Sequence, residues 1–364
     1  MSTLFRPVES EVAREGVSKG TSSDFSVREL DSDNEGRWDD FVKAHPQGSF
    51  YHLAGWRKVF ERTLKQETRY LYCASGTQVK AILPLTCIRS RIFGNALISS
   101  PFLVYGGPLA SDGRAEEAVV NAAVDLAHDL GVGYLEFRNR QETTRDWEVR
   151  SNYATFSKEL DPDPNVNLSQ IPRKQRAMIR KGIDAGLQSE SDDNVDRLYS
   201  AMLECKRNLG TPFFGKNYLR DLVDTFGDDV EVLTVTRSGR TVCSVMSFRY
   251  GGQILPYYGG GGEAARKYKG NDFMYWAVME KACQEGVQIF DFGRSMVGSG
   301  AYHFKKHWGF EPQTLNYEYW PVSRRSIPEV NPSNPRYRLL IEAWKRMPLR
   351  LAGIIGPIIA RQLG

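Results

Sequence analysis

The sequence predicts an α/β protein whose mixed sheet carries helices and is built from two tandem copies of one domain. Each half contains, in the same order, a two-stranded hairpin, a strand with a Tyr-Gly-Gly sequence, a helix and a further strand. Self-similarity of this kind indicates a duplicated unit. Because hairpins precede the helix in each copy, the sheet should be mixed and not uniformly parallel. A chain of 364 residues suits two domains of roughly 100–200 residues each.

The hairpins come first. "YLYCASGTQVKAILPLTCI" should turn at Gly76, and "EVLTVTRSGRTVCSVMSFRY" should turn at Gly239. The next pair is "SSPFLVYGGPL" and "QILPYYGGGG", in which Tyr105 matches Tyr258. Both halves are therefore expected to place a Tyr-Gly-Gly strand beside the hairpin.

A helix and a strand complete each copy. "RAEEAVVNAAVDLAHDLGV" and "NDFMYWAVMEKACQEGV" carry apolar residues at helical spacing. Gly131 and Gly286 follow them, where a left-handed residue commonly ends a helix. In the strands that come next, Glu136 matches Asp291.

The domain ranges follow from this repeat. Residues 25–160 form the first copy and 161–325 the second, with a helical insert that opens the second copy. We expect one helix within "NVNLSQIPRKQRAMIRKGIDAGL", one in "DNVDRLYSAMLECKRNLG" capped by Asp193 or Asn194, and one in "FGKNYLRDLVDTFGDD". Residues 1–24 are expected to be a disordered leader, and 326–364 a basic amphipathic extension.

Composition narrows the functional classes. The net charge of +4 permits an anionic ligand without requiring one. The five cysteines are scattered, with no C-x-x-C pair or Cys/His cluster, which argues against disulfides and against a bound metal. No apolar run is long enough to span a bilayer. We therefore expect a cytoplasmic protein.

The stretch "FDFGRSMVGSGAYHFKKHWGF", residues 290–310, gathers charged residues around a glycine-rich loop. Lys305 can stabilise a developing oxyanion, or it can be an ordinary surface lysine. Lys306 should point elsewhere, toward solvent or a phosphate. Asp291 is either a general base or a structural carboxylate that accepts backbone amides. Arg294 can clamp an anion or pair with Asp291.

Other candidate substrate-binding residues lie before and after the second Gly-rich strand. Tyr257 and Tyr258 precede four glycines, where the backbone is open to a ligand, although Tyr258 can equally serve the fold. Asn271 and Asp272 are placed to cap the following helix. In the insert, Arg173, Arg176 and Arg180 share one helical face, which suits either a phosphate-rich ligand or plain solvation. 

Several motifs together resemble a known family. The hairpin, Gly-ended strand, helix and strand resemble the Gcn5-related N-acetyltransferase (GNAT) fold, and the tandem arrangement resembles the FemAB family. "GNALISSPFLVYGG", "RNLGTPFFGKNYL", "KGNDFMYW" and "DFGRSMVGSGAYHFKKHWGFEP" are similar to FemAB-like proteins associated with exosortase (PEP-CTERM) systems. The resemblance spans roughly residues 45 to 364.

That resemblance implies two GNAT-like acyltransferase domains and transfer of an acyl or aminoacyl group to an amine of a cell-envelope precursor. It implies an aminoacyl-tRNA donor, an anionic peptidoglycan or exopolysaccharide precursor as acceptor, no tightly bound cofactor, and Lys305 next to the donor carbonyl. An acyl-CoA donor is the alternative, and a non-catalytic RNA- or membrane-binding module is another. "KYKGND" departs from the usual pyrophosphate-binding run because Asp272 closes it with a negative charge. The first copy lacks an "FKKHWGF" segment, so it is expected to bind the acceptor.

The C-terminal extension mixes basic and apolar residues in "YRLLIEAWKRMPLRLAGIIGPIIARQLG". Two interpretations stay open. The segment can lie at the inner face of the plasma membrane, or it can pack on the core as a final helix.

Overall fold

A single mixed sheet runs through the computed structural model, which describes residues 25–90, 94–323 and 338–363. The strands of this part of the chain pair in the order β1-β2-β3-β4-β6-β13-β7-β12-β11-β10-β9-β8, and β5 pairs with β3. We call residues 25–160 the first half and 161–323 the second half. The predicted leader, residues 1–24, lies outside the described residues, as do residues 324–337.

The elements of the first half are β1 (Ser26–Glu29), α1 (Glu35–Ala44), α2 (Gly55–Arg62), β2 (Glu67–Ser75), β3 (Gln78–Ser90), β4 (Gly94–Ser99), β5 (Leu109–Ala110), α3 (Gly113–Asp129), β6 (Tyr134–Asn139) and β7 (Glu148–Glu159). Those of the second half are α4 (Pro164–Gln170), α5 (Arg173–Asp184), β8 (Leu187–Ser191), α6 (Asp196–Leu209), α7 (Lys216–Phe226), β9 (Val230–Arg237), β10 (Arg240–Tyr250), β11 (Gln253–Gly261), α8 (Glu263–Tyr268), α9 (Gly270–Gln284), β12 (Ile289–Met296), α10 (Gly300–His307) and β13 (Gln313–Pro321). Two further helices, α11 (Arg338–Lys345) and α12 (Leu349–Ala360), follow.

The repeat predicted from the sequence is present in the sheet. The antiparallel hairpins β2–β3 and β9–β10 turn at Gly76 and Gly239, both with positive φ. Helices α3 and α9 are followed by Gly131 and Gly286, also with positive φ. Each half then adds a parallel pair, β4 with β6 and β11 with β12. The mixed α/β fold class is confirmed.

The Tyr-Gly-Gly match is not structurally equivalent in the two halves. Tyr258 lies within β11, whereas Tyr105 lies beyond the end of β4. The first-half chain leaves the sheet after Ser99 because Ser100 and Phe102 both adopt positive φ, which turns the backbone out of the strand. The two matching Tyr-Gly-Gly sequences therefore lie in different places: within a strand in the second half, and after the end of a strand in the first.

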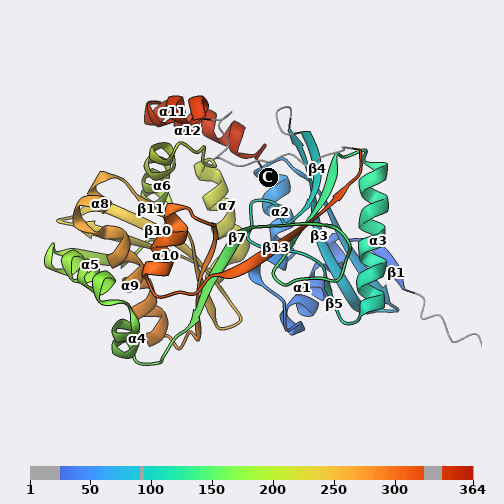
Figure 1. Ribbon diagram of the computed structural model, residues 1–364, viewed down its shortest axis with the longest axis horizontal. Helices are drawn as coiled ribbons and strands as arrows, with labels where there is room; N and C mark the ends of the chain where they lie inside the picture. Colours follow the sequence, from blue (N-terminus) through green and yellow to red (C-terminus); the bar gives the residue numbers. More distant parts are fainter. Residues whose placement is uncertain (1–24, 91–93, 324–337, 364) are drawn as a thin grey trace, which may run out of the picture.

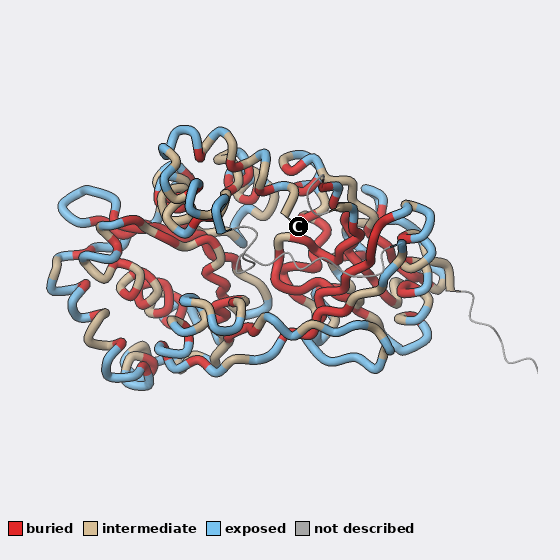
Figure 2. The backbone as a smooth tube through the Cα atoms, turned by 45° about the horizontal axis from the view of Figure 1, so that its top comes forward, coloured by how far each residue is buried: buried red, intermediate tan, exposed pale blue. Residues whose placement is uncertain are grey.

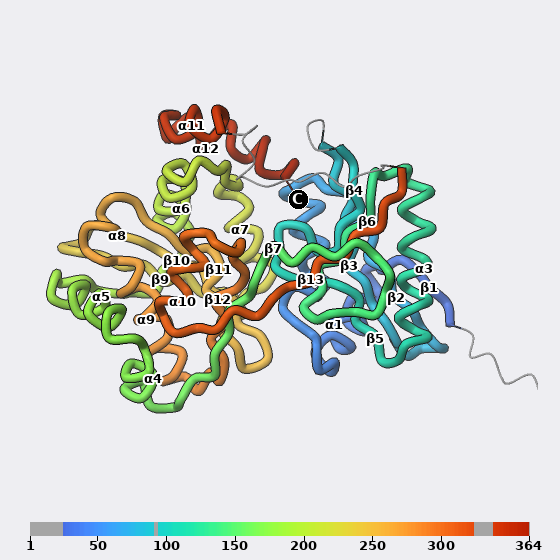
Figure 3. The backbone as a smooth tube through the Cα atoms, viewed as in Figure 1, coloured from blue at the N-terminus to red at the C-terminus, as the bar shows by residue number. Residues whose placement is uncertain are grey.

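The two halves exchange strands. β7 pairs with β12 of the second half, and β13 returns to pair with both β7 and β6 of the first half. Figure 3 shows these two segments crossing between the halves. The predicted boundary at residue 160 thus falls at the end of a strand that lies in the neighbouring half of the sheet.

The sheet is covered on both faces in the second half. In β11, a side chain at Gly259 would point at Met274 and Tyr275 of α9, and one at Gly260 would point at Met202 and Cys205 of α6. Successive residues of a strand face opposite sides of the sheet, so α9 and α6 lie on opposite faces. Figures 1 and 2 show the buried strands enclosed by helices whose outer sides are exposed.

An apolar cluster joins the halves beside the sheet. Phe50 of the first half stacks on Phe248 of β10 with ring centroids 4.5 Å apart. Phe226, at the end of α7, lies 4.7 Å from the same Phe50 ring. These aromatic contacts add burial at the junction between the halves.

The helical insert differs from its prediction at two points. The single helix expected over "NVNLSQIPRKQRAMIRKGIDAGL" is broken into α4 and α5 at Ile171, which is extended (ψ 132°). Pro172 follows, and a proline disfavours helical backbone in the residue before it. At the start of α6 the N-cap position is Val195, which provides no side-chain cap, and Asn194 accepts a hydrogen bond from the amide of Asp196.

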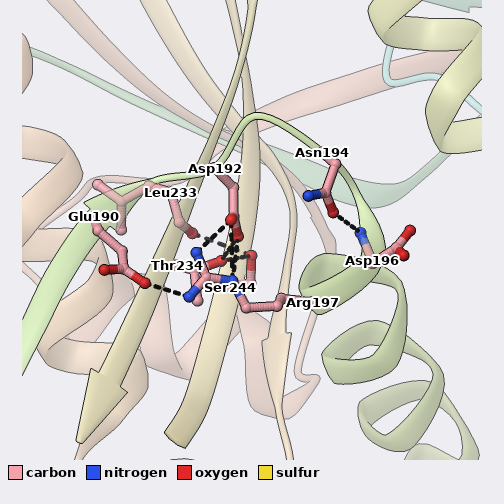
Figure 4. Close-up of polar contacts among 8 residues, drawn as sticks. All are labelled: Glu190, Asp192, Asn194, Asp196, Arg197, Leu233, Thr234 and Ser244. Carbon is pink, nitrogen blue, oxygen red and sulfur yellow. Dashed lines mark hydrogen bonds and ion pairs between the residues drawn. The ribbon is translucent and has the colours of Figure 1, made fainter. Parts of the chain in front are cut away.

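A buried carboxylate anchors the start of α6 to the sheet (Figure 4). Asp192 accepts hydrogen bonds from Arg197 Nε, at 3.0 and 2.9 Å, and from the hydroxyl of Thr234 on β9. Arg197 also pairs with Glu190. Because α6 packs on β10 and β11 and in turn carries α11 and α12, this anchor fixes the position of all three helices.

Replacing Asp192 with Asn should lower the free energy of unfolding by about 1.5–3 kcal/mol, since hydrogen bonds to a buried charged acceptor are lost. The control is Asp196→Asn, because Asp196 is 58% exposed in its pair with Lys216, and such pairs contribute about 0–1 kcal/mol. Urea denaturation measures both. Equal effects from the two variants would contradict the anchor.

Candidate functional site

The site is built where β11 and β12 separate. Their parallel pairing is limited to Gln253–Ile289 and Ile254–Phe290 among the described residues. A first-half segment, residues 100–107, lies against both strands beyond that point. Tyr257 on β11 donates a hydrogen bond to the carbonyl oxygen of Phe102 at 2.9 Å. A side chain at Gly293 on β12 would come within 3.8 Å of Val104. 

The carbonyl groups of this inserted segment are satisfied by buried side chains. Arg138 on β6 donates to the Leu103 oxygen at 3.2 Å, and Tyr317 on β13 donates to the Val104 oxygen. Buried backbone groups without such partners would be costly. Polar side chains from β6, β11 and β13 therefore hold the segment in place.

Asp291 is the buried carboxylate of the site, at 1% exposure. Its Oδ2 accepts a hydrogen bond from Tyr105 Oη at 2.9 Å, and its Oδ1 accepts one from the Gly293 amide at 2.7 Å. β12 shifts register against β7 between Asp291 and Gly293, and Gly293 has a φ of 66°. A glycine is needed for this irregularity, because other residues adopt positive φ only at a cost.

Lys305 lies under the same bulge, on α10. The helix is capped by Ser299, whose Oγ accepts from the Tyr302 amide at 3.2 Å. Lys305 is 9% exposed, and its Nζ donates to the carbonyl oxygens of Gly293 and Arg294, each at 3.0 Å. Burial lowers the pKa of Lys305 to about 7, while Asp291 acts in the opposite direction. Lys306, one residue on, is exposed.

Arg294 lies between tyrosine rings. Its guanidinium is 4.8 Å from the ring centre of Tyr153 and 5.8 Å from that of Tyr317, and it donates to Tyr317 Oη at 2.8 Å. Of the two roles expected for Arg294, the pairing with Asp291 is not formed: within the described residues no carboxylate forms an ion pair with Arg294. The cation thus retains its capacity to bind an anion.

The other predicted residues make more local contacts. Tyr258 shares a hydrogen bond of 2.8 Å with Tyr218, which ties α7 to the sheet. Asn271 and Asp272 do not cap α9, whose N-cap position is Lys269. Asp272 instead accepts hydrogen bonds from Gln175 and Trp308, and the Oδ1 atom of Asn271 is buried with no partner in the described part of the chain.

The basic helix α5 is separate from this cluster. Arg173 and Arg180 are exposed, and Arg176 donates to the carbonyl oxygen of Ser169 at 2.6 Å. None of the three contacts Asp291, Arg294 or Lys305 through a hydrogen bond among the described residues. The structure brings together Asp291, Arg294, Lys305 and Tyr257, and leaves the cations of α5 at the surface.

A cavity of about 560 Å³ opens beside Tyr105 on the first-half side. Arg140 lies at its rim with the guanidinium 5.3 Å from the ring centre of Tyr105. His52 lies deeper, where its Nε2 faces the Gly107 carbonyl oxygen at 3.1 Å and must therefore be the protonated nitrogen. Burial lowers the pKa of His52 to about 4, so it is neutral at physiological pH.

Sequence reasoning missed several members of the cluster. In the sequence Tyr105 belongs only to the repeat, and Tyr153, Tyr317 and Arg138 stand in no motif. Tyr153 and Tyr317 lie on the exchanged strands β7 and β13. Since that exchange is invisible in the sequence, no local pattern could have placed their hydroxyl groups or rings beside Arg294.

Comparison with known proteins agrees with the fold. Residues 172–306 match the family model described as an acetyltransferase (GNAT) domain. No curated protein matches the chain significantly.

Solved structures that resemble the chain include FemX, with 13% identity, a TM-score of 0.62, and coverage of 87% of this chain and 100% of that one. A tandem GNAT protein from the clavulanic acid biosynthesis pathway has 12% identity and a TM-score of 0.54, covering 83% and 100%. A C-terminal domain (DUF2156) from Agrobacterium fabrum, described as part of a lysylphosphatidylglycerol synthetase, has 13% identity and a TM-score of 0.54, covering 79% and 91%. At these identities the similarity concerns the fold.

The lowered pKa of Lys305 should affect the pH dependence of stability. In the unfolded chain the pKa of this lysine is about 10.4. Between about pH 7 and about pH 10 the unfolded state therefore binds a proton that the folded state has lost. The free energy of unfolding should rise with pH over this range. Lys305→Met should lack this contribution, and its stability relative to the parent should fall over that range. Denaturation of both proteins between about pH 7 and pH 9.5 measures the difference; parallel curves would contradict it.

Proposed function

We propose that the protein transfers an activated acyl or aminoacyl group to an amine of an anionic cell-envelope precursor. The observation that carries this proposal is the buried Lys305 ammonium, held against the Gly293 bulge next to Asp291 and Arg294. The match of residues 172–306 to an acetyltransferase model covers this constellation. The names of two similar structures, a tandem GNAT protein and a lysylphosphatidylglycerol synthetase, refer to proteins of the same general kind.

Lys305 fits the role of oxyanion donor. When the acceptor nitrogen bonds to the acyl carbon, the carbonyl oxygen becomes negatively charged, and a fixed cation lowers the energy of that state. An ammonium group has three N–H donors, and two of them bind the carbonyl oxygens of Gly293 and Arg294. The third forms no hydrogen bond within the described residues, and we propose that it faces the oxyanion beside the Phe156 ring, whose centre is 5.5 Å from Nζ. The bond from the acyl carbon to the donor oxygen or sulfur then breaks, and the proton lost by the amine passes to the leaving group.

Asp291 supports this role without contacting the reacting atoms. Its carboxylate raises the pKa of Lys305 against the effect of burial, and so favours the charged form. Its hydrogen bond to the Gly293 amide also fixes the backbone whose carbonyl oxygen holds Lys305. We therefore assign Asp291 as a positioning residue.

The donor is proposed to be an aminoacyl-tRNA. Two carboxylates lie near the end of β11, where a pyrophosphate group would have to bind in an acyl-CoA enzyme. Glu204 accepts from the Glu263 amide at 3.3 Å, and Asp272 occupies the first turn of α9. Both disfavour a phosphate there. The exposed Arg173 and Arg180 of α5 suit a phosphate backbone instead.

The acceptor is proposed to enter through the cavity beside Tyr105. Arg140 and Arg138 both line it, and Arg140 forms no ion pair in the described part of the chain. A phosphate or carboxylate of an envelope precursor would supply the missing negative charge. Tyr105 lines the cavity and donates a hydrogen bond to Asp291, so the cavity lies next to the residues that hold Lys305.

The proposal is tested by turnover assays with purified protein, a mixture of charged tRNAs or a panel of acyl-CoA thioesters, and muropeptide acceptors. Lys305→Met should reduce kcat about 10²–10³-fold, the usual loss for one oxyanion donor. Lys306→Met is the matched control and should retain activity, because Lys306 is exposed. Transfer from acyl-CoA only would correct the donor, and full activity of Lys305→Met would remove Lys305 from the mechanism.

The pH profile of kcat separates two roles of Lys305. As an oxyanion donor the lysine must be charged, so kcat should fall as the pH rises through about 7, the pKa of Lys305. As a general base it must be neutral, and kcat would rise over the same range. A rising profile that is lost in Lys305→Met would contradict the oxyanion role.

The α5 surface has its own test. Replacing Arg173 and Arg180 with Gln should weaken tRNA binding and reduce the slope of log K against log salt by about 1–2, because fewer counterions are released. Arg28 and Arg37, exposed in the first half, serve as the control pair. An unchanged slope in the α5 variant would mean that this face is only solvated.

A further inference from the structure

The C-terminal helix α12 is packed with its small residues inward. Ala352, Gly356 and Ala360, four residues apart, form its buried stripe. A side chain at Gly356 would come 3.0 Å from the carbonyl oxygen of Phe213, and one at Gly353 would come 3.2 Å from Tyr199 Oη on α6. The helix therefore lies close against the body of the second half, as one of the two interpretations of the sequence expected.

The large aliphatic residues of α11 and α12 point outward. Leu339 and Leu340 on α11 are 83% and 68% exposed. Leu351, Ile354 and Ile358 on α12 are 48%, 67% and 51% exposed. We call these five residues the C-terminal apolar face. With Leu349 they make up six of the eleven large exposed apolar residues of the described chain, so the exposure is concentrated here. Figure 1 shows both helices on the outside of α6.

Unpaired cations border this face. Arg350 and Arg361 are eleven residues apart, which at 100° per residue places them about 20° apart around α12. Arg350 lies one turn before Ile354, and Arg361 about one turn after Ile358. Neither forms an ion pair within the described residues. The single carboxylate of the two helices, Glu342, is bound by Lys345 at 2.8 Å.

A basic cavity adjoins the face. It measures about 610 Å³ and is lined by Pro357 and Ile358 of α12, by Arg361 just after that helix and by Lys65, among others. Lys65, like Arg361, has no carboxylate partner in the part of the chain that the structure describes. The apolar side chains and the free positive charges thus share one surface.

Exposed aliphatic side chains beside unpaired cations fit some binding partners better than others. An apolar protein surface would cover the aliphatic side chains but would leave Arg350 and Arg361 without negative partners. A second copy of the chain would present the same positively charged surface and would supply no negative partner from these two helices beyond Glu342, which Lys345 already binds. An anionic bilayer satisfies both features, because its acyl chains accept aliphatic side chains and its headgroups attract arginine and lysine.

We propose that α11 and α12 form a docking surface for an anionic membrane, with both helices lying in the plane of the interface. The C-terminal apolar face enters the boundary between headgroups and acyl chains, and Arg350, Arg361 and Lys65 contact lipid phosphates. Neither helix is long enough to cross a bilayer. The inference does not depend on the proposed reaction, since it rests on residues outside that site.

Co-sedimentation of the full chain with vesicles tests the proposal. The protein should bind vesicles of phosphatidylcholine with phosphatidylglycerol, bind pure phosphatidylcholine vesicles about tenfold less, and dissociate as salt is added. The variant Leu351→Asn/Ile354→Asn/Ile358→Asn should bind the anionic vesicles at least about tenfold more weakly. Since these side chains are exposed, the variant should fold, which circular dichroism verifies.

The matched control is Val149→Asn/Ile183→Asn, because these residues are 49% and 53% exposed elsewhere on the surface. It should bind like the parent. Arg350→Gln/Arg361→Gln should lose most of the preference for phosphatidylglycerol. Parental binding by the triple variant would overturn the proposal. So would a lipid-free dimer that the triple variant abolishes, since a second copy would then cover the face.

Discussion

The architecture of the site depends on one buried hydrogen-bonded carboxylate. Asp291 comes from the second half, and Tyr105, which donates to it, comes from the first. A carboxylate with 1% exposure is tolerated only when hydrogen bonds replace its lost hydration. The two halves must therefore meet in one register, with residues 100–107 inserted beside β12. The same carboxylate holds the Gly293 amide, and the carbonyl group of Gly293 holds Lys305.

In the first half, the carboxylate that matches Asp291 is stabilised in a different way. Glu136 matches Asp291, but it forms a buried ion pair of 2.8 Å with Arg138, two residues further along β6. In β12 that position is Gly293, whose positive φ creates the bulge. An arginine in place of the glycine keeps β6 regular and neutralises the carboxylate locally. This explains in physical terms why the fold is repeated while the Lys305 constellation occurs once in the described chain.

Local patterns predicted the repeated elements well, because hairpin turns and helix ends are set by residues close in sequence. Gly76, Gly239, Gly131 and Gly286 all have the positive φ that their positions implied. The difference in burial between Lys305 and Lys306 also followed from their adjacency on a helix. Pro172 is a local signal for the break between α4 and α5, because a proline disfavours helical backbone in the residue before it.

Contacts between segments that are far apart in the sequence could not be predicted from local patterns. The place of Tyr105 depends on Ser100 and Phe102, two residues that adopt positive φ without being glycine. The ring pair around Arg294 depends on β7 and β13 crossing between the halves. Both are consequences of tertiary packing, for which single-sequence periodicity has no signal.

The strand exchange also has a consequence for how the chain is made. During synthesis the first half emerges with one side of β6 unpaired, since its neighbour β13, residues 313–321, is translated long after β6. A strand edge that stays unpaired until a distant segment has been synthesised can pair with other chains. Contacts between residues so far apart in the sequence also form slowly. Nascent chains should therefore need protection until β13 has been synthesised, and a truncation before residue 313 should leave both halves prone to aggregation.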